Sequence, residues 1–428
     1  MRADRVVAWS SFVNKVSIQD PRGDLTAPQP AAAPITPDRI GVSNSSNGTG
    51  RNHASSGVAQ PRRIAIAVGG TAGHIYPGLA LAENYAAASN RVEILIIGRE
   101  ASLESQAASR GGYRFAPIAA SPMLGERISG KARALANLGA GFVRARAILR
   151  AERIELAIGF GGYGCAGTLL AARSLGLRTV VHEANVIPGL TTRILGAMAD
   201  RVCVAFEEAG KRFPPERIAV TGTPIRAEII KLARKVHSAP DGDRPARILV
   251  TGGSLGSAFL NEQMPRLLEL LLQTVPALEV LHQTGYQAGL DEPERVLANY
   301  TGRGMKARAT RYIEDMAEAY LWADFVISCA GANTLAELAV IGLPALIIPM
   351  RAVAHNHQFH TARVFSARTG THWMAEEAWE PEKLAADIAS MLRDREVWMA
   401  ASNRMRNFAT PGAAGAVIAC CDGLLNGA

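Results

Sequence analysis

Short apolar runs alternate with longer amphipathic stretches from about residue 62 towards the end of the chain. Runs of Val, Ile, Leu and Ala flanked by Gly or Pro are typical of strands buried on both faces, and the stretches between them are typical of helices. This alternation predicts an α/β protein with parallel, doubly wound sheets. The predicted strands cover residues 64–68, 93–98, 115–119, 156–160, 179–182, 201–205, 218–221, 247–251, 278–282, 306–312, 325–328 and 345–349.

A turn-rich segment, Ser238–Pro245, interrupts the alternation and indicates a linker. We therefore expect two Rossmann-like domains with a cleft between them. A final helical stretch, Val397–Leu425, is long enough to cross back over the first domain. The domain limits that we infer are 62–226, 227–403 and, for the returning helix, 404–428.

Residues 1–61 are rich in Ala, Pro, Ser, Asn and Gly and show little periodicity. Such a segment buries too little apolar surface to offset the entropy of ordering, so we expect a disordered N-terminal extension. The remaining length, in a chain of 428 residues that is 48% hydrophobic, is enough for two domain cores.

Cysteine content and charge indicate the cellular compartment and the kind of partner that suit this protein. The five cysteines include no C-x-x-C pair, which is typical of proteins in a reducing compartment. No run approaches the roughly eighteen consecutive apolar residues of a membrane span. A net charge of +8 with a pI near 9.4 favours an acidic partner. Nucleic acid and anionic lipid headgroups both fit, and charge alone does not choose between them.

The stretch 325–363 carries the clearest chemistry. It predicts a strand, a Gly-containing turn, a helix from Asn333 stopped by Gly342, and a second strand. In such units ligands lie beyond the carboxyl ends of the strands, where the next helix presents unpaired N–H groups to phosphate. Glu337 lies on the same helix face as Asn333, within reach of a ribose hydroxyl, and the polar run 355–358 follows the second strand. The stretch therefore indicates a nucleotide-sugar site.

Two further Gly-rich turns connect a strand to a helix. Gly69–Gly73 lacks the Lys of a P-loop, but it is followed by His74 and by a helix that we expect from about Pro77, so the histidine lies near the start of that helix. A histidine there titrates near neutral pH and can act as a general base, or it only caps the helix. Gly252–Gly256 can bind phosphate through backbone N–H groups or merely turn the chain.

A third turn, Gly159–Gly164, matches G-x-G-x-x-G after a strand, and Glu183 ends the next strand. This arrangement is typical of an NAD site, so a dehydrogenase is an alternative function. Three predicted strands precede the turn, however, whereas the fingerprint normally opens a domain's first βαβ unit.

Metal binding has little support in the sequence. Asp241-Gly242-Asp243 resembles a D-x-D metal site, but it lies in the linker without a preceding buried strand and favours a turn. We therefore expect no metal or other cofactor. A departing diphosphate would instead be stabilised by helix N-termini and by cations such as Arg226.

Eight motifs, in order along residues 62–410, together resemble the MurG family of N-acetylglucosaminyltransferases. They are GGTAGHIYPGLALA (69–82), GFGGYGCAG (159–167), HEAN (182–185), PGLTTR (188–193), TGTPIR (221–226), TGGSLGS (251–257), YIEDMAEAY (312–320) and CAGANTLAELAVIGLPALIIP (329–349). The resemblance implies the GT-B fold. The N-terminal domain is then expected to bind the acceptor and the membrane, and the C-terminal domain the UDP-sugar.

The resemblance also implies a role for each matching residue. Thr71, Ala72 and Gly73 would face the donor, and Arg226 and Ser254 would contact its diphosphate. The main chain of Ile313 would contact the uracil, Glu337 the ribose and Gln358 the sugar. The phosphates would be contacted by the turn Ala332, Asn333, Thr334, Leu335 and Ala336. Tyr163 and Asn185 would lie on the acceptor side, with His74 as the catalytic base. Four positions differ from the usual family pattern and leave donor choice open: Thr223, Leu255, Cys329 and Thr361.

The implied reaction is inverting transfer of N-acetylglucosamine from UDP-GlcNAc to the 4-hydroxyl of undecaprenyl-diphospho-N-acetylmuramoyl-pentapeptide, in peptidoglycan biosynthesis. Such an enzyme is expected on the cytoplasmic face of the plasma membrane, as a peripheral protein without a nucleic-acid partner. Besides the dehydrogenase, two alternatives stay open: a related GT-B transferase with another sugar or lipid acceptor, and a non-catalytic UDP-sugar-binding protein.

A lipid-linked acceptor would explain the net positive charge, because such an enzyme works at an anionic membrane surface. Within Arg127–Arg153, apolar and basic residues are interspersed, so the segment can lie on an anionic leaflet. An ordinary amphipathic helix with its apolar face in the core is the alternative. The residues concerned are Leu135, Leu138, Phe142 and Ile148, and Arg127, Lys131, Arg133, Arg144, Arg146 and Arg150.

Overall fold

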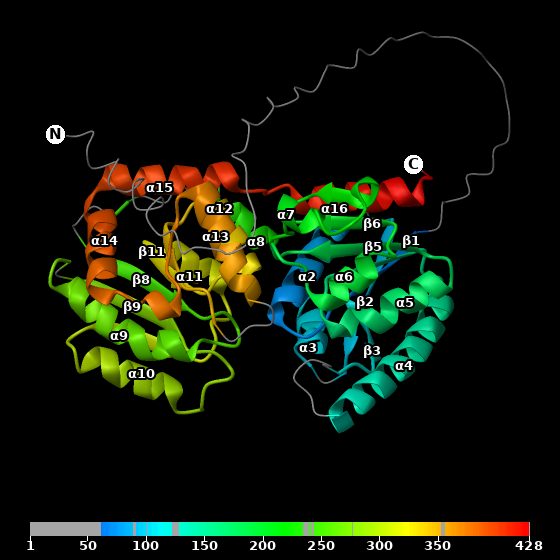
Figure 1. Ribbon diagram of the computed structural model, residues 1–428, viewed down its shortest axis with the longest axis horizontal. Coiled ribbons are helices and arrows are strands. Elements are labelled where there is room, and N and C mark those ends of the chain that lie inside the picture. The colour runs from blue at the N-terminus through cyan, green and yellow to red at the C-terminus, as the bar shows by residue number, and fades with distance from the viewer. Residues whose placement is uncertain are drawn as a thin grey trace, which may run out of the picture. The chain divides into compact units, whose positions relative to one another are not determined.

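The computed structural model describes residues 61–88, 91–100, 102–121, 128–233, 239–240, 244–275, 277–351 and 356–427. Residues 61–428 form one compact unit, which Figure 1 shows as two sheets flanked by helices. The expected extension up to residue 60, the Asp241–Asp243 turn, Arg127 and His355 lie outside the described residues.

The first sheet consists of seven parallel strands in the order β3-β2-β1-β4-β5-β6-β7. The strands are β1 (Arg62–Ala67), β2 (Val92–Arg99), β3 (Arg114–Ile118), β4 (Leu156–Gly159), β5 (Arg178–Glu183), β6 (Arg201–Val204) and β7 (Ile218–Val220). Its helices are α2 (Ala72–Ala88), α3 (Leu103–Arg110), α4 (Ile128–Ala151), α5 (Ala166–Ser174), α6 (Leu190–Gly196) and α7 (Glu207–Gly210).

The second sheet has six parallel strands in the order β10-β9-β8-β11-β12-β13. The strands are β8 (Ala246–Thr251), β9 (Leu278–Gln283), β10 (Lys306–Thr310), β11 (Phe325–Ser328), β12 (Ala345–Ile347) and β13 (His372–Trp373). Its helices are α8 (Ala227–Leu232), α9 (Ala258–Leu272), α10 (Glu292–Thr301), α11 (Met316–Trp322), α12 (Ala332–Ile341), α13 (His357–Thr369), α14 (Pro381–Arg393) and α15 (Arg395–Phe408). The predicted fold class, two doubly wound α/β sheets, is confirmed.

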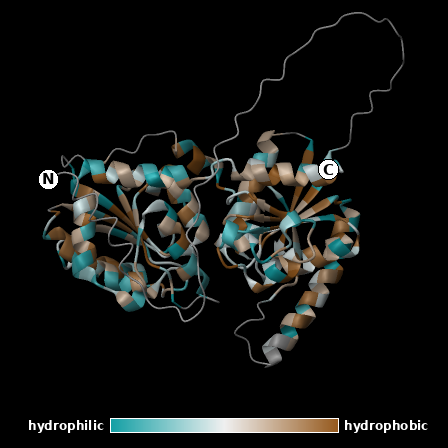
Figure 2. Cartoon of the chain, turned by 45° about the horizontal axis from the view of Figure 1, so that its top comes forward, coloured by the Kyte–Doolittle hydropathy of each residue, from teal (hydrophilic) through white to brown (hydrophobic). Residues whose placement is uncertain are grey.

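Burial on both faces explains the continuous apolar runs. In β1, Ile64 and Ile66 pack into the core on one face of the first sheet, while Ala65 and Ala67 pack into the core on the other. Successive side chains of a strand point to opposite faces, so a strand covered by helices on both sides needs an apolar residue at every position. The brown strands at the centre of each sheet in Figure 2 show this pattern.

The predicted long C-terminal helix is wrong in detail, because it is two helices. α15 ends at Phe408, and α16 (Ala413–Leu425) begins after the segment Ala409–Gly412, which contains a Pro-Gly pair. Val417 and Cys421 of α16 are buried in the core of the first sheet, whereas Trp398 of α15 is buried against the second and donates a hydrogen bond to the carbonyl of Asp324. Figure 1 shows both helices in red.

By length and composition alone, Arg395–Leu425 resembles a membrane-spanning helix. The break between α15 and α16 and the packing of each helix on a sheet core instead make it part of the folded unit. Within the described residues it is the one stretch that meets those criteria.

Candidate active site

One cleft of about 690 Å³ is lined by residues of both sheets. In each sheet the strand order reverses beside the first strand, between β1 and β4 and between β8 and β11. The loops beyond the carboxyl ends of such neighbouring strands face a common crevice. The turns that follow these four strands all contribute to the cleft wall. The two strand-order reversals therefore define one site.

Most residues implied by the family resemblance lie on this cleft. They are Thr71, Ala72, Gly73, His74, Tyr163, Asn185, Arg226, Ser254, Ala332, Asn333, Thr334, Glu337 and Gln358. The fold brings them together from turns and helix starts on both sheets. Ile313, Leu335 and Ala336 do not line it.

The α12 helix limits which phosphate contacts are possible. Leu335 is fully buried, and its N–H donates to the carbonyl of Gly331 at 3.0 Å. Only the first turn of a helix has N–H groups without helical acceptors, so Leu335 and Ala336 are past the groups that bind an anion. The phosphate contacts expected from residues 332–336 are therefore restricted to the N–H groups of its first members.

The main chain at Ile313 is also less available than the sequence suggests. Its N–H donates to Oε1 of Gln283 at 2.8 Å. In this arrangement the N–H is therefore not free for a uracil, and contact of the Ile313 main chain with a uracil stays a prediction. Gln283 itself lines the cleft, although sequence analysis did not single it out.

His74 lies half-buried in the first turn of α2, on the cleft wall. Its main-chain N–H donates to the carbonyl of Thr71 at 2.9 Å, and its Nδ1 lies 3.3 Å from the Thr71 hydroxyl oxygen. Burial lowers the pKa of His74, and the carboxylate of Glu183 partly opposes this effect. The imidazole is therefore neutral at pH 7, the form in which it can accept a proton.

The Gly-rich turn after β4 packs directly against the turn that carries His74. Gly162 has φ of +73°, and a Cβ built there would lie 2.4 Å from the carbonyl oxygen of Gly69 and 3.1 Å from His74 Nδ1. A Cβ on Gly69 would lie 2.7 Å from the Cα of Gly164. No side chain fits between the two turns, so glycine is required for their close approach.

Glu183 binds its own loop. Its Oε1 accepts hydrogen bonds from the main-chain and side-chain N–H groups of Asn185, both at 2.9 Å, and its Oε2 accepts from the N–H of Gly189 at 3.1 Å. The carboxylate is 4% exposed. Glu183, the acidic residue whose position is typical of an NAD site, therefore shapes the loop that holds Asn185 at the cleft.

Pro77 explains a hydrogen bond across the cleft. The sequence predicts a helix start near Pro77, but α2 begins at Ala72 and contains the proline. Because proline has no N–H, it cannot donate to the carbonyl of Gly73 one turn earlier. That carbonyl instead accepts from Nδ2 of Asn333 on α12, at 2.9 Å. The contact joins the His74 turn to the start of α12.

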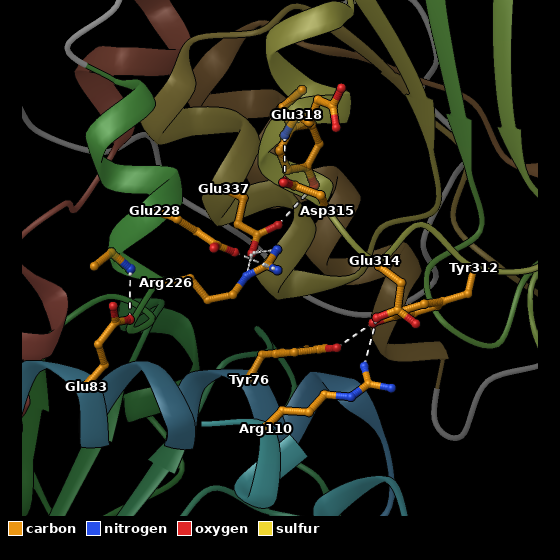
Figure 3. A network of polar contacts seen from close by, with 12 residues as sticks. Tyr76, Glu83, Arg110, Arg226, Glu228, Tyr312, Glu314, Asp315, Glu318 and Glu337 are labelled. Atoms are coloured by element: carbon orange, nitrogen blue, oxygen red, sulfur yellow. Dashed lines mark hydrogen bonds and ion pairs between the residues drawn. The ribbon is translucent and has the colours of Figure 1, made fainter. Parts of the chain in front are cut away.

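Arg226 is paired with carboxylates in the cleft. Its guanidinium donates to Oε1 of Glu337 at 3.0 Å and lies 3.2 Å from Glu228, and it stacks over the Tyr76 ring at 5.1 Å (Figure 3). Glu337 also accepts from the hydroxyl of Tyr320 at 3.0 Å. The two residues expected at the diphosphate and the ribose therefore lie next to each other.

A second pair of contacts borders the cleft near Arg226. The hydroxyls of Tyr76 and Tyr312 are hydrogen-bonded to each other, and Arg110 forms an ion pair with Glu314 at 2.8 Å (Figure 3). Tyr76 and Tyr312 both line the cleft. Tyr76 is not among the residues expected at the site from the sequence, although it lies two residues after His74.

The four departures from the family pattern occupy different places. Leu255 and Cys329 line the cleft, and burial raises the pKa of the Cys329 thiol to about 12, so it stays uncharged. Thr361 is buried and accepts a 3.4 Å hydrogen bond from the N–H of Val186. Thr223 is 1% exposed, and its hydroxyl has no hydrogen-bond partner among the described residues. Leu255 and Cys329 are therefore the departures that can contact a donor.

Glu104, which the sequence did not indicate, lies behind the His74 turn. It is fully buried, its Oε1 accepts from the N–H of Gly70 at 3.0 Å, and the same oxygen lies 3.4 Å from Arg99 Nε. Arg99 in turn stacks over the ring of Tyr163 at 5.4 Å. Burial raises the pKa of Glu104, but hydrogen bonds from Ser102 and Gly70, with the charge of Arg99, outweigh it and hold that pKa below its usual value.

Replacing Glu104 with alanine is expected to lower the free energy of unfolding by about 3 kcal/mol, because it leaves the Gly70 N–H and the Arg99 guanidinium without their buried partner. Urea unfolding of the two proteins measures the difference. Glu100→Ala, an exposed glutamate in the same connection, is the control and is expected to change stability little. Equal stabilities for the Glu104 and Glu100 variants would contradict a supporting role.

No group of three or more His, Cys, Asp or Glu side chains that could hold a metal ion occurs within the residues that the structure describes.

The fold and cleft define a class of enzyme. Residues 64–204 match the glycosyltransferase family 28 N-terminal domain, and residues 247–415 match the glycosyltransferase family 28 C-terminal domain. Two domains, each built on a parallel sheet and both lining one cleft, constitute the GT-B arrangement, and the chain is a hexosyltransferase of this class.

The particular family follows from full-length relatives. A Geobacter sulfurreducens protein named "UDP-N-acetylglucosamine--N-acetylmuramyl-(pentapeptide) pyrophosphoryl-undecaprenol N-acetylglucosamine transferase" is 34% identical over 356 residues, covering 83% of this chain and 97% of that protein. A protein of the same name from Geotalea uraniireducens is 36% identical, covering 77% and 89%. The crystal structure of Acinetobacter baumannii MurG is 25% identical with a TM-score of 0.65, covering 84% and 99%. The chain belongs to the MurG family of N-acetylglucosamine transferases.

Proposed function

We propose that this protein transfers N-acetylglucosamine from UDP-GlcNAc to the 4-hydroxyl of undecaprenyl-diphospho-N-acetylmuramoyl-pentapeptide, a step of peptidoglycan biosynthesis. The observation that carries the proposal is the convergence of His74, Arg226 and the N-terminus of α12 on one cleft. Family membership supports both substrates, because the relatives are named for them. On this proposal the first sheet and its loops bind the acceptor, and the second sheet binds the donor.

Donor binding uses the start of α12. The N–H groups of its first turn point beyond the carboxyl end of β11 and are suited to the diphosphate. Ser254 in the turn after β8 faces the same cleft. Gln358 at the start of α13 is expected at the sugar, and its Oε1 already accepts from the N–H of Met350 at 2.9 Å, which fixes the side chain.

Proton removal is assigned to His74. The imidazole is neutral and lies on the cleft wall beside the Gly-rich turns. It can accept the proton of the acceptor hydroxyl while that oxygen attacks the anomeric carbon from the side opposite to UDP. Attack from the opposite side inverts the configuration at that carbon.

Departure of UDP is assisted by fixed positive groups. Arg226 is held beside the cleft by Glu337 and Glu228, and the α12 N-terminus adds the partial positive charge of its free N–H groups. On binding, the diphosphate would compete with these carboxylates for the guanidinium. A ribose hydroxyl would then donate a hydrogen bond to the Glu337 carboxylate. The chain's own residues thus supply the charge stabilisation that the leaving group needs.

Access for a lipid-linked acceptor is proposed along α4 and α6. Leu138 of α4 and Leu190 and Ile194 of α6 line the cleft, and the last two are 44% and 55% exposed. On α4, Leu135 and Val143 are 63% and 67% exposed. The two helices thus carry exposed apolar side chains as well as residues of the cleft wall, which suits an acceptor that stays in a membrane.

The amphipathic segment is divided between core and surface. Phe142 and Ile148 pack against the core of the first sheet, as an ordinary amphipathic helix would have them. Arg133, Arg144 and Arg150 are exposed. We infer that α4 presents its outer face to anionic headgroups on the cytoplasmic side of the plasma membrane, with the protein bound peripherally.

Charge reversal tests the membrane surface. The triple variant Arg133→Glu, Arg144→Glu and Arg150→Glu is expected to lose at least tenfold in affinity for vesicles containing anionic lipid at low salt, because each basic residue contributes about 1 kcal/mol near such a surface. Cosedimentation measures it. The control reverses Arg178, Lys306 and Arg395, which are exposed elsewhere and give the same net charge. Equal binding of the two variants would rule out α4 as the contact.

Isothermal titration with UDP-GlcNAc, UDP-GalNAc and NAD in metal-free buffer tests the donor. Selective binding of UDP-GlcNAc is expected. Selective binding of UDP-GalNAc would instead favour a related transferase, and binding of NAD alone would favour the dehydrogenase and contradict the proposal. Affinity for UDP-GlcNAc without turnover in the presence of acceptor would favour a non-catalytic binding protein.

A further inference from the structure

Gln283 is a buried amide whose hydrogen-bonding capacity is used to join two loops. It is 3% exposed and ends β9. Its Oε1 accepts from the N–H of Ile313 at 2.8 Å, and its Nε2 donates to the carbonyl of Gly253 at 2.7 Å and to the hydroxyl of Thr251 at 3.2 Å. One side chain thus connects the turn after β8 to the loop after β10.

The sheet topology places Gln283 between these loops. β9 lies between β8 and β10, and in the parallel register Gln283 is opposite Thr251 on one side and Thr310 on the other. Thr251 and Thr310 are the last residues of β8 and β10, so a side chain at the carboxyl end of β9 reaches the segments that follow both strands. An amide suits the position because it carries an acceptor and a donor at a fixed separation.

Further hydrogen bonds make the turn after β8 rigid. The Thr251 hydroxyl oxygen also accepts from the N–H of Gly253 at 3.1 Å, and the Gly253 carbonyl also accepts from the N–H of Gly256 at 3.2 Å. Gly253 has φ of +75°, which favours glycine. Both acceptors of the Gln283 amide nitrogen therefore belong to a fixed turn, and Ser254, next in the chain, projects from that turn at the cleft.

We propose that Gln283 is a positioning residue for the UDP part of the donor, setting the spacing between the turn that carries Ser254 and the loop that carries Ile313. The inference rests on the proposed function, which puts the diphosphate near the first loop and the nucleobase near the second. Because the Ile313 N–H is taken by Gln283, the nucleobase is recognised by other groups of that loop, held in place through Gln283.

A positioning residue for UDP affects binding rather than chemistry. UDP is bound in both the ground state and the transition state, so a misplaced loop weakens both to a similar extent. The expected result is a higher KM for the donor with kcat nearly unchanged at saturation. Loss of a group that acts on the reacting atoms would lower kcat instead.

Gln283→Glu is the sharpest variant, because the new side chain has nearly the same shape. The carboxylate can still accept from Ile313 but cannot donate to Gly253, whose carbonyl oxygen it would repel. The control is Gln287→Glu, which makes the same chemical change four residues later on an exposed side chain. Gln283→Met, which removes both polar ends without adding charge, separates loss of the bridge from an effect of charge.

The measurement is isothermal titration of each protein with UDP, together with donor kinetics and a thermal unfolding scan. Both Gln283 variants are expected to bind UDP at least tenfold more weakly than the Gln287 variant, with kcat within about threefold. Unchanged or tighter UDP binding in Gln283→Met, in protein that remains folded, would overturn the proposal. Failure of the unaltered protein to bind UDP would instead contradict the proposed function, so the two failures are distinguishable.

Discussion

Replacing His74 with alanine is expected to lower kcat by about 10²-fold or more, because the acceptor hydroxyl would lose the group that takes its proton. The affinity for UDP is expected to change little, since the side chain acts on the acceptor oxygen and not on the nucleotide. Steady-state kinetics with saturating donor and acceptor, together with titration of UDP, measure the two quantities separately.

His360→Ala is a suitable control, because this histidine lies on α13 but does not line the cleft. A kcat for the His74 variant within about threefold of the control would remove His74 from the role of base. His74→Gln adds a second test, since glutamine keeps a polar side chain at the turn but accepts no proton at neutral pH.

The pH dependence of kcat/KM gives the same assignment an independent test. Burial lowers the pKa of His74, so its neutral form persists below the ordinary value of 6.5. Activity is therefore expected to be constant near pH 7 and to fall only as pH drops through that lowered pKa. Glu183 and Glu104 raise the pKa of His74, whereas His357 lowers it. An acidic limb above pH 6.5, or one that survives in His74→Ala, would contradict the assignment.

Replacing Arg226 with glutamine is expected to lower kcat by about 10²- to 10³-fold, the range seen when one preorganised group that stabilises developing charge is removed. The same change leaves Glu337, a residue that is 8% exposed, with the Tyr320 hydroxyl but without a cation beside the incoming diphosphate. Donor KM is therefore expected to rise as well, and kinetics with varied UDP-GlcNAc measure both effects.

Arg110→Gln is the matched control, because Arg110 is also paired with a glutamate near Tyr312 but has an exposed side chain outside the main cleft (Figure 3). It is expected to change kcat by less than about threefold. If Arg226→Gln raised only KM and left kcat at the control value, Arg226 would bind the ground state and would not stabilise the departing diphosphate.

The sheets were predictable because they are buried on both faces. A strand such as β1, which is apolar and buried at every position from Ile64 to Ala67, can be recognised from the sequence alone. β13 was missed because it has only two residues, His372 and Trp373, and no apolar run. The start of α2 was misplaced because proline is typical of a first helical position. Only the structure shows that the Gly73 carbonyl, to which Pro77 cannot donate, accepts a hydrogen bond from Asn333 instead.

Site residues were predictable where the residue type and its local sequence indicate a chemical role, and not where the role depends on how the chain packs. Glycine turns and His74 stand out between apolar runs, and the family resemblance indicates most of the other expected residues, whereas Tyr76 and Gln283, which also line the cleft, give no such signal. Glu104 was not, since a glutamate in the first turn of a surface helix is ordinary and only the fold buries it behind Gly70. Likewise, the pairing of Arg226 with Glu337 depends on two segments that are 111 positions apart.

The most direct test of the proposed transferase activity is an assay of transfer to the lipid acceptor in the presence of a metal chelator. The protein is incubated with UDP-GlcNAc labelled in the sugar and with undecaprenyl-diphospho-N-acetylmuramoyl-pentapeptide in detergent, and the product is analysed by mass and by anomeric configuration. The expected product is an acceptor heavier by one N-acetylglucosamine residue joined through a β-linkage, with release of UDP. Release of free sugar into water, no transfer at all, or an α-linked product would contradict it.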